Sequence, residues 1–400
     1  MNPETTLEAP NFLEDYLDRQ PVQIGGYLIL PWGDDNCYPN RIMQVCISNG
    51  LVSQIMNKHF ELLWGKGPQL YKTEFASGRR YKQWISNKEV ESWLESWIYK
   101  DYLEKITVEY LLLNACVTKF HVIGSAVEKL EFISCDGARL QWAGLNIPAT
   151  SMIIGDFVNY TISGYDRFAI MDPENPLAQK ESICFEALYQ AGVEFYPRSP
   201  IHSSLPWIHA GAKTARQINA FNGNSISPKY HFEVPDTYWE NYRIKLKSEC
   251  HAKGISFNEN MLKAVMDETF EEVSNALSGI HNVGKFLVTD IIYDERSGKY
   301  QGWTVTLLET KNGDYLNAQL KIAHETQFNV ASGMGMHPAL TGMRKSGGLS
   351  TGSEFLYAAE IYKQVQVEFA ERKIMKSINA AIAINFKDIK AKLGFNRDNI

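Results

Sequence analysis

The residues best suited to chemistry lie in one stretch rich in glycine and serine, residues 342–353. Its two cations, Arg344 and Lys345, can contact the phosphates of a nucleic-acid backbone without reading the base sequence. The neighbouring glycines allow this backbone to change conformation. The candidate loop residues are Gly342, Met343, Arg344, Lys345, Ser346, Gly347 and Gly348. The other interpretation of the Arg-Lys pair is an ordinary exposed loop.

A second chemistry for the same stretch is nucleotide binding. Residues 346–353 precede a predicted helix, and the exposed amides at a helix start favour anions. The stretch nevertheless lacks the Gly-Lys-Ser/Thr ending of a P-loop, and it follows a helical pattern rather than a buried strand. A nucleotide-dependent transferase that uses residues 346–353 is therefore the alternative function and not the first choice.

The remaining candidate sites do not predict an enzyme. His324-Glu325 begins like a zinc-protease helix, but the second histidine of that motif is missing. Acidic pairs such as Asp34-Asp35 are typical of turns. The six cysteines are scattered, which favours small buried residues in a reducing compartment over a metal site or a disulfide framework. We expect no catalytic residues, no cofactor and no metal.

The composition of the 400 residues predicts a packed protein of two or three subdomains, since 44% are hydrophobic and 12% are aromatic. The formal net charge of -6 excludes a general nucleic-acid-coating protein, which would have a basic surface. It does not exclude a protein that lets DNA slide past, because a strongly basic channel would hold the duplex. The sequence contains no run of about twenty apolar residues, so we expect no membrane-spanning helix.

Two helical patterns flank the loop and must position it. Residues 317–331 have helical spacing, and Gly333, Gly335 and Pro338 end that helix. Downstream, residues 354–386 contain no glycine or proline, and their apolar pattern changes phase at Ile374, which predicts a bend or a change of packing partner. The residues expected on one face of the upstream helix are Leu316, Leu320, Ala323, Gln327 and Val330.

The rest of the chain predicts an α+β protein. Helical spacing dominates up to residue 113, with inward positions at Val52, Ile55, Met56, His59 and Leu63. Period-two patterns follow, and mostly antiparallel strands are expected at 117–123, 130–134, 152–158, 167–171 and 183–189.

A helix is expected at 205–221, and its few charges include Lys213 and Arg216. These two residues would face either a channel lumen or a neighbouring subunit. Residues 226–312 then read as a separate unit of a strand, two helices (237–253 and 257–277) and two further strands (285–289 and 303–308). Residues 387–400 form a short polar tail.

A helix, a mobile loop with an Arg-Lys pair and a very long bent helix, in this order, resemble the portal proteins of tailed bacteriophages and prophages, the head-to-tail connector family. The residues that carry the resemblance are 333–342 and 347–354. The Tyr38-Pro39 opening and the helix that runs into Gly65-Lys66-Gly67-Pro68 are similar to portals of Bacteroides-type prophages.

The resemblance implies a portal-like fold with a wing, two stem helices, an α/β clip, a tunnel loop and a long bent wing helix. The implied parts are the N-terminal wing (1–200), the first stem helix (201–225), the clip (226–312), the second stem helix (313–335), the tunnel loop (336–353), the long wing helix (354–386) and the short C-terminal tail (387–400).

The resemblance also implies a function, which is structural and not enzymatic. Portal subunits form a homo-oligomeric ring, usually a dodecamer, at one capsid vertex of the virion, and they are in the host cytoplasm during assembly. Double-stranded DNA passes through the ring nonspecifically. The implied partners are the terminase large subunit, the major capsid protein and a tail connector or adaptor, with no membrane. In this context the phosphate-contacting interpretation of Arg344 and Lys345 is favoured over an ordinary loop.

Overall fold

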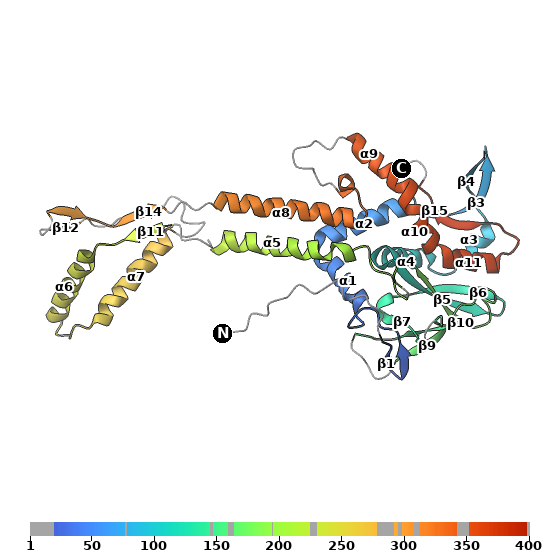
Figure 1. Cartoon of the computed structure of the whole chain (residues 1–400), viewed down its shortest axis with the longest axis horizontal. Helices are drawn as coiled ribbons and strands as arrows, with labels where there is room; N and C mark the ends of the chain where they lie inside the picture. The colour runs from blue at the N-terminus through green and yellow to red at the C-terminus, as the bar shows by residue number, and fades with distance from the viewer. Residues whose placement is uncertain are drawn as a thin grey trace. The chain divides into compact units, whose positions relative to one another are not determined.

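The computed structural model describes residues 20–76, 78–144, 147–158, 164–193, 195–224, 230–277, 292–294, 298–307, 312–341 and 352–397. The chain divides into two compact units, of which the larger comprises residues 1–215 and 319–400 and the smaller residues 216–318 (Figure 1). Helices α5 (Leu205–Asn224) and α8 (Asn312–Gly333) each run from one unit into the other.

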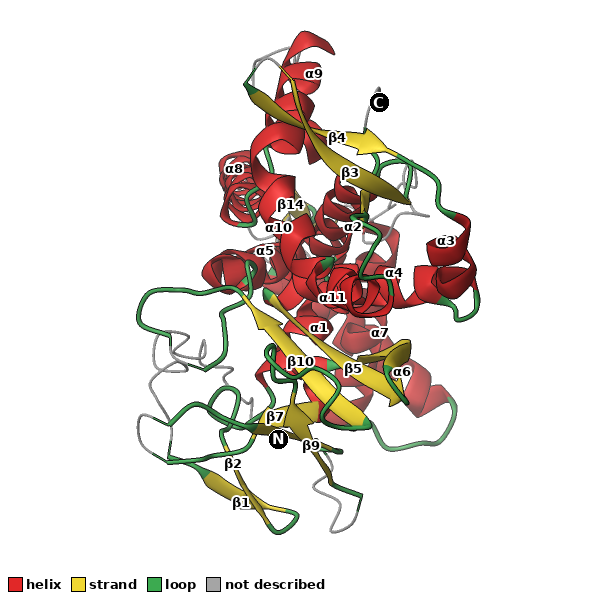
Figure 2. Ribbon diagram, turned by 90° about the vertical axis from the view of Figure 1, so that its right-hand side faces the viewer, coloured by secondary structure: helices red, strands yellow, loops and turns green. Residues whose placement is uncertain are grey.

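The larger unit is built around a six-stranded sheet in the order β6-β5-β10-β9-β8-β7. All neighbouring strands are antiparallel except β9 and β10, and Figure 2 shows β5 and β10 side by side. The strands are β5 (Ala115–Ile123), β6 (Ala126–Ile133), β7 (Ala138–Leu140), β8 (Ser151–Ile154), β9 (Asp166–Ile170) and β10 (Glu181–Ala187). The five predicted strands are therefore present, and β7 was not predicted.

Between residue 20 and this sheet, the described residues form the helices α1 (Tyr38–Ser48), α2 (Gly50–Trp64), α3 (Lys88–Glu95) and α4 (Tyr99–Leu113). A small hairpin, β1 (Val22–Ile24) and β2 (Tyr27–Ile29), lies before them. All five predicted inward residues of α2 are buried. The helical spacing before residue 113 ends with the two helices α3 and α4.

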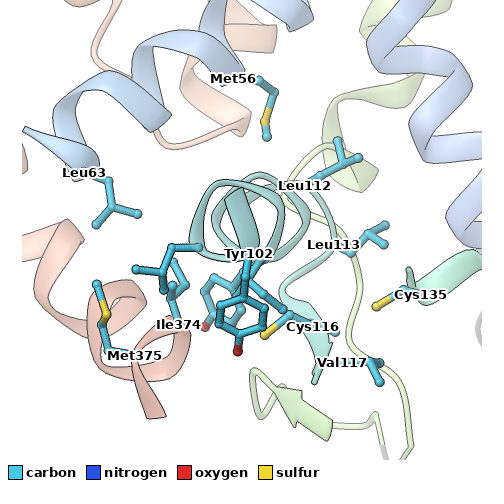
Figure 3. Close-up of a cluster of buried hydrophobic side chains, with 14 of the residues drawn as sticks. Met56, Leu63, Tyr102, Leu112, Leu113, Cys116, Val117, Cys135, Ile374 and Met375 are labelled. Atoms are coloured by element: carbon cyan, nitrogen blue, oxygen red, sulfur yellow. The ribbon is translucent and has the colours of Figure 1, made fainter. Parts of the chain in front are cut away.

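Helix α4 is central to the hydrophobic core (Figure 3). Tyr102 of α4 lies near Cys116 of β5 and Ile374, and its hydroxyl is 2.8 Å from the Thr118 hydroxyl. Burial raises the pKa of the Cys116 thiol well above its usual value. Cys116, Cys135 and Cys184 are buried, as the scattered cysteines predicted, whereas the other three cysteines are partly exposed.

The long helical segment after the loop is interrupted twice. It comprises α9 (Gly352–Ile361), a π-helical turn (Tyr362–Gln366), α10 (Val367–Ile374) and α11 (Lys376–Asn385). The predicted change of phase at Ile374 coincides with the break between α10 and α11. The π-helical turn adds a second irregularity, because one turn with five-residue hydrogen bonding rotates the following residues relative to a regular helix.

The last described residues form a strand that the sequence patterns did not predict. β15 (Lys392–Phe395) pairs antiparallel with β3 (Pro68–Ala76), which pairs with β4 (Arg79–Trp84). Leu393 and Phe395 are 2% and 1% exposed, so this part of the predicted polar tail belongs to the core. Four residues that include a glycine are too few to display a period, and the pairing partner lies about 320 residues earlier.

In the smaller unit, the described residues between α5 and α8 form two helices and two short antiparallel sheets. The helices are α6 (Asp236–Ala252) and α7 (Glu259–Leu277), close to the predicted ranges. β11 (Tyr230–Glu233) pairs with β14 (Thr304–Leu307), and β12 (Ile292–Asp294) pairs with β13 (Lys299–Gln301). The predicted strand at 285–289 lies outside the described residues. Trp239 packs against Phe270 and Trp303 at ring-centroid distances of 5.8 and 6.2 Å.

Replacement of Phe395 tests the role of β15. We expect Phe395→Ala to lower the free energy of unfolding by about 3–5 kcal/mol, because it leaves a cavity where a buried ring was. Urea denaturation measures this change. Lys392→Ala, at an exposed position of the same strand, is the control and should change stability by less than about 0.5 kcal/mol. Equal effects of the two substitutions would contradict the buried strand.

Candidate functional site

The loop that the sequence singles out runs between two described elements. After α8 comes a 3-10 turn (Pro338–Thr341), and α9 begins at Gly352. The candidate residues Gly342, Met343, Arg344, Lys345, Ser346, Gly347 and Gly348 lie outside the described residues. The structure therefore defines the two anchors of this loop.

The upstream anchor is a Schellman motif at the end of α8. Gly335 has a φ of +74°, a left-handed conformation that favours glycine. Its N–H donates to the carbonyl oxygen of Ser332, and the N–H of Met336 donates to that of Ala331, both at 2.9 Å. The Met336 side chain is buried. Gly335 thus ends the helix as the sequence predicted, and burial of Met336 fixes the direction in which the chain leaves it.

His59 of α2 connects this anchor to the segment after the loop. Its Nε2–H donates to the carbonyl oxygen of Met334 at 3.1 Å, and its Nδ1 accepts the hydroxyl hydrogen of Tyr362. We assign these roles because a carbonyl oxygen can only accept a hydrogen bond. Met334 precedes the loop and Tyr362 follows it. We call these three residues the His59 joint.

The His59 joint consists of uncharged groups. Burial lowers the pKa of His59 to about 4, and the hydrogen bond to Met334 only partly opposes this shift. Burial also raises the pKa of the Tyr362 hydroxyl. At neutral pH the imidazole is therefore neutral, and both of its nitrogens are hydrogen-bonded. Removing one partner would leave a buried polar group unsatisfied, at a cost of about 1–3 kcal/mol.

The downstream anchor includes the π-helical turn. Tyr362 is the first residue of this turn, and its side chain is 6% exposed. π-Helical turns are uncommon and bend the helix that contains them. The inward-facing Tyr362 side chain thus coincides with the point where the helix after the loop departs from regular geometry.

Lys213 and Arg216, the two predicted residues of α5, are both exposed. A spacing of three residues gives them neighbouring positions on the helix surface. On the other side of α5, a Cβ atom at Gly211 would lie 2.8 Å from Cγ2 of Thr326 in α8. The close approach of these two helices therefore depends on a glycine, and it leaves Lys213 and Arg216 accessible to another molecule.

The face of α8 that the helical spacing defines is buried only in part. Val330 is buried, but Leu320 is 52% exposed and Gln327 is exposed. Thr326, which is not one of the residues on that face, is buried. The physical reason is the glycine contact described above, since a small residue on α5 selects which side of α8 approaches it. The side chain of Leu316 is outside the described set.

Two buried carboxylates that sequence reasoning missed each bind two cations. Glu371 of α10 accepts hydrogen bonds from Lys82 (2.8 Å), Arg397 and the N–H of Phe395. Glu186 of β10 accepts from Lys373 and Lys376. These contacts tie α10 and α11 to both sheets. Only spatial proximity identifies them, because the partners are 187 to 289 residues apart in most cases.

The described residues do not form a recognisable catalytic constellation. No group of three or more His, Cys, Asp or Glu among them could hold a metal ion. Residues 348–352 have the Gly-x-Ser-x-Gly spacing of a nucleophile elbow, and residues 348–351 lie outside the described residues. Within the same set, no helix is sufficiently long and apolar to span a bilayer.

Comparisons with known proteins extend to structure only. No protein-family model and no curated protein sequence matches the chain. The structure is similar to a chain in the virion of a native gene transfer agent particle, with a TM-score of 0.58 and 11% identity over 90% of this chain and 84% of that chain. A chain in the neck of a native gene transfer agent particle, determined with C12 symmetry, matches with a TM-score of 0.57 and 12% identity.

The match to the C12-symmetric neck also covers 90% of this chain and 84% of the other. An HK97-family phage portal protein from Corynebacterium diphtheriae matches with a TM-score of 0.41 and 9% identity over 89% of this chain and 98% of that chain. At 11–12% identity, the gene transfer agent matches demonstrate a shared α+β fold that extends over both units of this chain.

The His59 joint predicts a specific dependence of stability on pH. The pKa of His59 is about 4 when folded and about 6.5 when unfolded. Between pH 6.5 and 4 the unfolded chain therefore binds a proton at His59 that the folded chain does not. As the pH falls through this range, the free energy of unfolding of wild type decreases by up to about 3 kcal/mol. Glutamine does not titrate, so the free energy of unfolding of His59→Gln does not contain this pH-dependent decrease. We expect the stability advantage of wild type over His59→Gln to shrink as the pH falls from 7 to 4.

Urea midpoints at pH 7, 5.5 and 4.5 measure the difference between the two proteins. Glu109, whose pKa burial raises to about 7, titrates with the opposite sign, because its stabilising contribution is lost as the pH rises from 4.5 to 7. It is present in both proteins and therefore cancels in the difference. A stability difference that is constant with pH would contradict the neutral, buried His59.

Proposed function

We propose that this chain is the subunit of a portal ring of a tailed bacteriophage or prophage. The ring occupies one vertex of the capsid, and double-stranded DNA passes through it during packaging and ejection. The resemblance of residues 333–354 to the portal family supports this role. The similarity to the Bacteroides type rests on the sequence resemblance of the first helices.

One observation carries the proposal. The fold is similar over 90% of the chain to a chain of a C12-symmetric particle neck. A neck with twelvefold symmetry requires a subunit that contacts two copies of itself. The similarity extends over both units of this chain, so the match reflects a shared overall architecture rather than one common subdomain. A portal role accounts both for this architecture and for the order of helix, loop and helix around residue 342.

The parts of the chain take the following roles in this proposal. Helices α5 and α8 are the stem, and the unit of residues 216–318 contains the clip, which docks the terminase large subunit. The unit that contains the six-stranded sheet is the wing, which contacts the major capsid protein. The chain contributes no ATP hydrolysis of its own. Tail connector proteins bind after packaging, so the protein is found in the virion and, during assembly, in the host cytoplasm.

The tunnel loop of this proposal is residues 336–353. Arg344 and Lys345 make transient contacts with phosphates, which carry no sequence information. The His59 joint supports this role, because it holds both sides of the loop to α2 while the loop itself rearranges around moving DNA. Lys213 and Arg216 are exposed on the stem and are the second set of residues proposed to face the channel or a neighbour.

The first experiment is to measure the mass of the purified chain by light scattering, with negative-stain images of the same fraction. We expect a particle of about twelve times the 45.5 kDa of one chain, with a central hole. A particle that stays a monomer at all concentrations, even together with the capsid protein, would overturn the proposal.

A double substitution tests the tunnel loop. We expect Arg344→Ala with Lys345→Ala to leave the ring intact and to weaken DNA binding. The slope of log binding constant against log salt should fall by about 1 for each phosphate that the variant no longer binds. Fluorescence anisotropy with a labelled duplex measures both quantities. Lys72→Ala with Lys88→Ala, two exposed lysines outside the proposed stem and tunnel loop, removes the same charge and is the matched control. Loss of the ring in the loop variant would contradict the separation of assembly from DNA contact.

A further inference from the structure

A row of large apolar side chains on the segment after the loop is open to solvent. Tyr357 and Ile361 of α9 are 67% and 63% exposed, Val365 of the π-helical turn is 68% exposed, and Phe369 of α10 is 41% exposed. The four residues follow one another at intervals of four, which is close to one turn both in the α-helical parts and in the wider π-helical turn, so they lie along one side of the helical segment. Single exposed apolar residues are ordinary on a protein surface, but a continuous row marks an interaction site. We call these four residues the α9–α10 row.

The α9–α10 row is separate from the side of the segment that packs into the core. Ala358, Tyr362, Val367 and Ile374 are each 8% exposed or less, and Tyr362 belongs to the His59 joint. The segment therefore has one apolar side that the chain itself covers and a second that it leaves open. A helix that is apolar on more than one side packs against more than one partner.

Polar groups border the α9–α10 row, as expected of a protein interface. The guanidinium of Arg372 lies 4.9 Å from the centre of the Phe369 ring. A groove of about 1460 Å³ runs beside the segment, and Leu356, Glu360 and Lys363 line it. An apolar centre with a charged rim matches the composition of interfaces between proteins rather than that of a small-ligand pocket.

Symmetry indicates which partner covers the α9–α10 row. A chain of similar fold occurs in a neck determined with C12 symmetry, where each copy has two like neighbours. In a closed ring the contact is heterologous, so each subunit offers one surface to the neighbour on one side and a different surface to the other. A row along one side of one helical segment is such a single surface. In such a contact the α9–α10 row of one subunit would meet a different surface of the neighbouring subunit, not the same row.

We propose that the α9–α10 row is the surface through which one subunit binds the neighbouring copy of this chain. This inference rests on the proposed function and assigns the ring contact to named residues. Burial of four large side chains also stabilises the segment that follows the loop, so the neighbour would support the downstream anchor from outside while His59 holds it from inside.

The test introduces charge into the α9–α10 row. Ile361→Glu with Val365→Glu should shift the protein from rings to monomers, with an association constant at least tenfold weaker, because two carboxylates would be buried without partners. Both positions are exposed in the single chain, so the urea midpoint of the monomer should stay unchanged. Ile47→Glu with Ile98→Glu, at residues that are 77% and 73% exposed, is the matched control and should still form rings.

The outcomes separate this inference from the proposed function. If wild type and the double variant both form rings, the assignment of the surface is overturned and the portal role stands. If wild type does not associate with itself under any condition, both are overturned. If only the double variant fails to form rings while it remains folded, the assignment is supported.

A crosslinking experiment identifies the partner directly. The photoreactive residue benzoylphenylalanine replaces Ile361, and unlabelled and ¹⁵N-labelled chains are mixed before assembly and irradiation. We expect crosslinked peptides that join a light to a heavy chain. Crosslinks confined to one chain, for example to residues 342–351, would overturn the assignment by showing that the loop of the same subunit covers the row.

Discussion

The hydrogen bonds of one buried histidine determine how the candidate loop is held. His59 lies on α2, almost three hundred residues before the loop, and contacts a backbone carbonyl on one side of it and a tyrosine hydroxyl on the other. A charged group could not do this at the same cost, because a buried ion would need a counter-ion. A neutral imidazole has one donor and one acceptor, which match a carbonyl and a hydroxyl. The described elements on both sides of the loop are therefore fixed to α2.

The carboxylates of Glu186 and Glu371 attach α10 and α11 to the rest of the larger unit. Each accepts from two cations, so both negative charges are fully compensated although the side chains are buried. Pairs of this kind add little net stability, but loss of one member leaves an unpaired charge. They fix α10 and α11 to two different sheets. In this way the ion pairs attach the C-terminal half of the helical segment that carries the α9–α10 row to the two sheets.

The longer helices and strands could be predicted from the sequence, because each contains enough residues for its hydrophobic period to be recognised. The inward side of α2, including His59, follows from the 3.6-residue repeat, and Gly335 is typical of a helix end. The partners of His59 could not be predicted, since neither a backbone carbonyl nor a tyrosine at the start of a π-helical turn has a sequence signature. Strand β15 is too short to show alternation, and the buried side of α8 depended on one glycine of another helix. Arg344 and Lys345 remain predictions from sequence.

The pairing of β15 with β3 has a consequence for biosynthesis. Residues 68–76 leave the ribosome long before residues 392–395, so the hairpin of β3 and β4 must wait for most of the chain to be made. Glu371, Lys82 and Arg397 can likewise meet only then. Contacts so distant in sequence form late in folding. The sheet that β3, β4 and β15 share therefore closes only on chains synthesised at least as far as residue 395, and prematurely terminated chains would be left with an open strand edge.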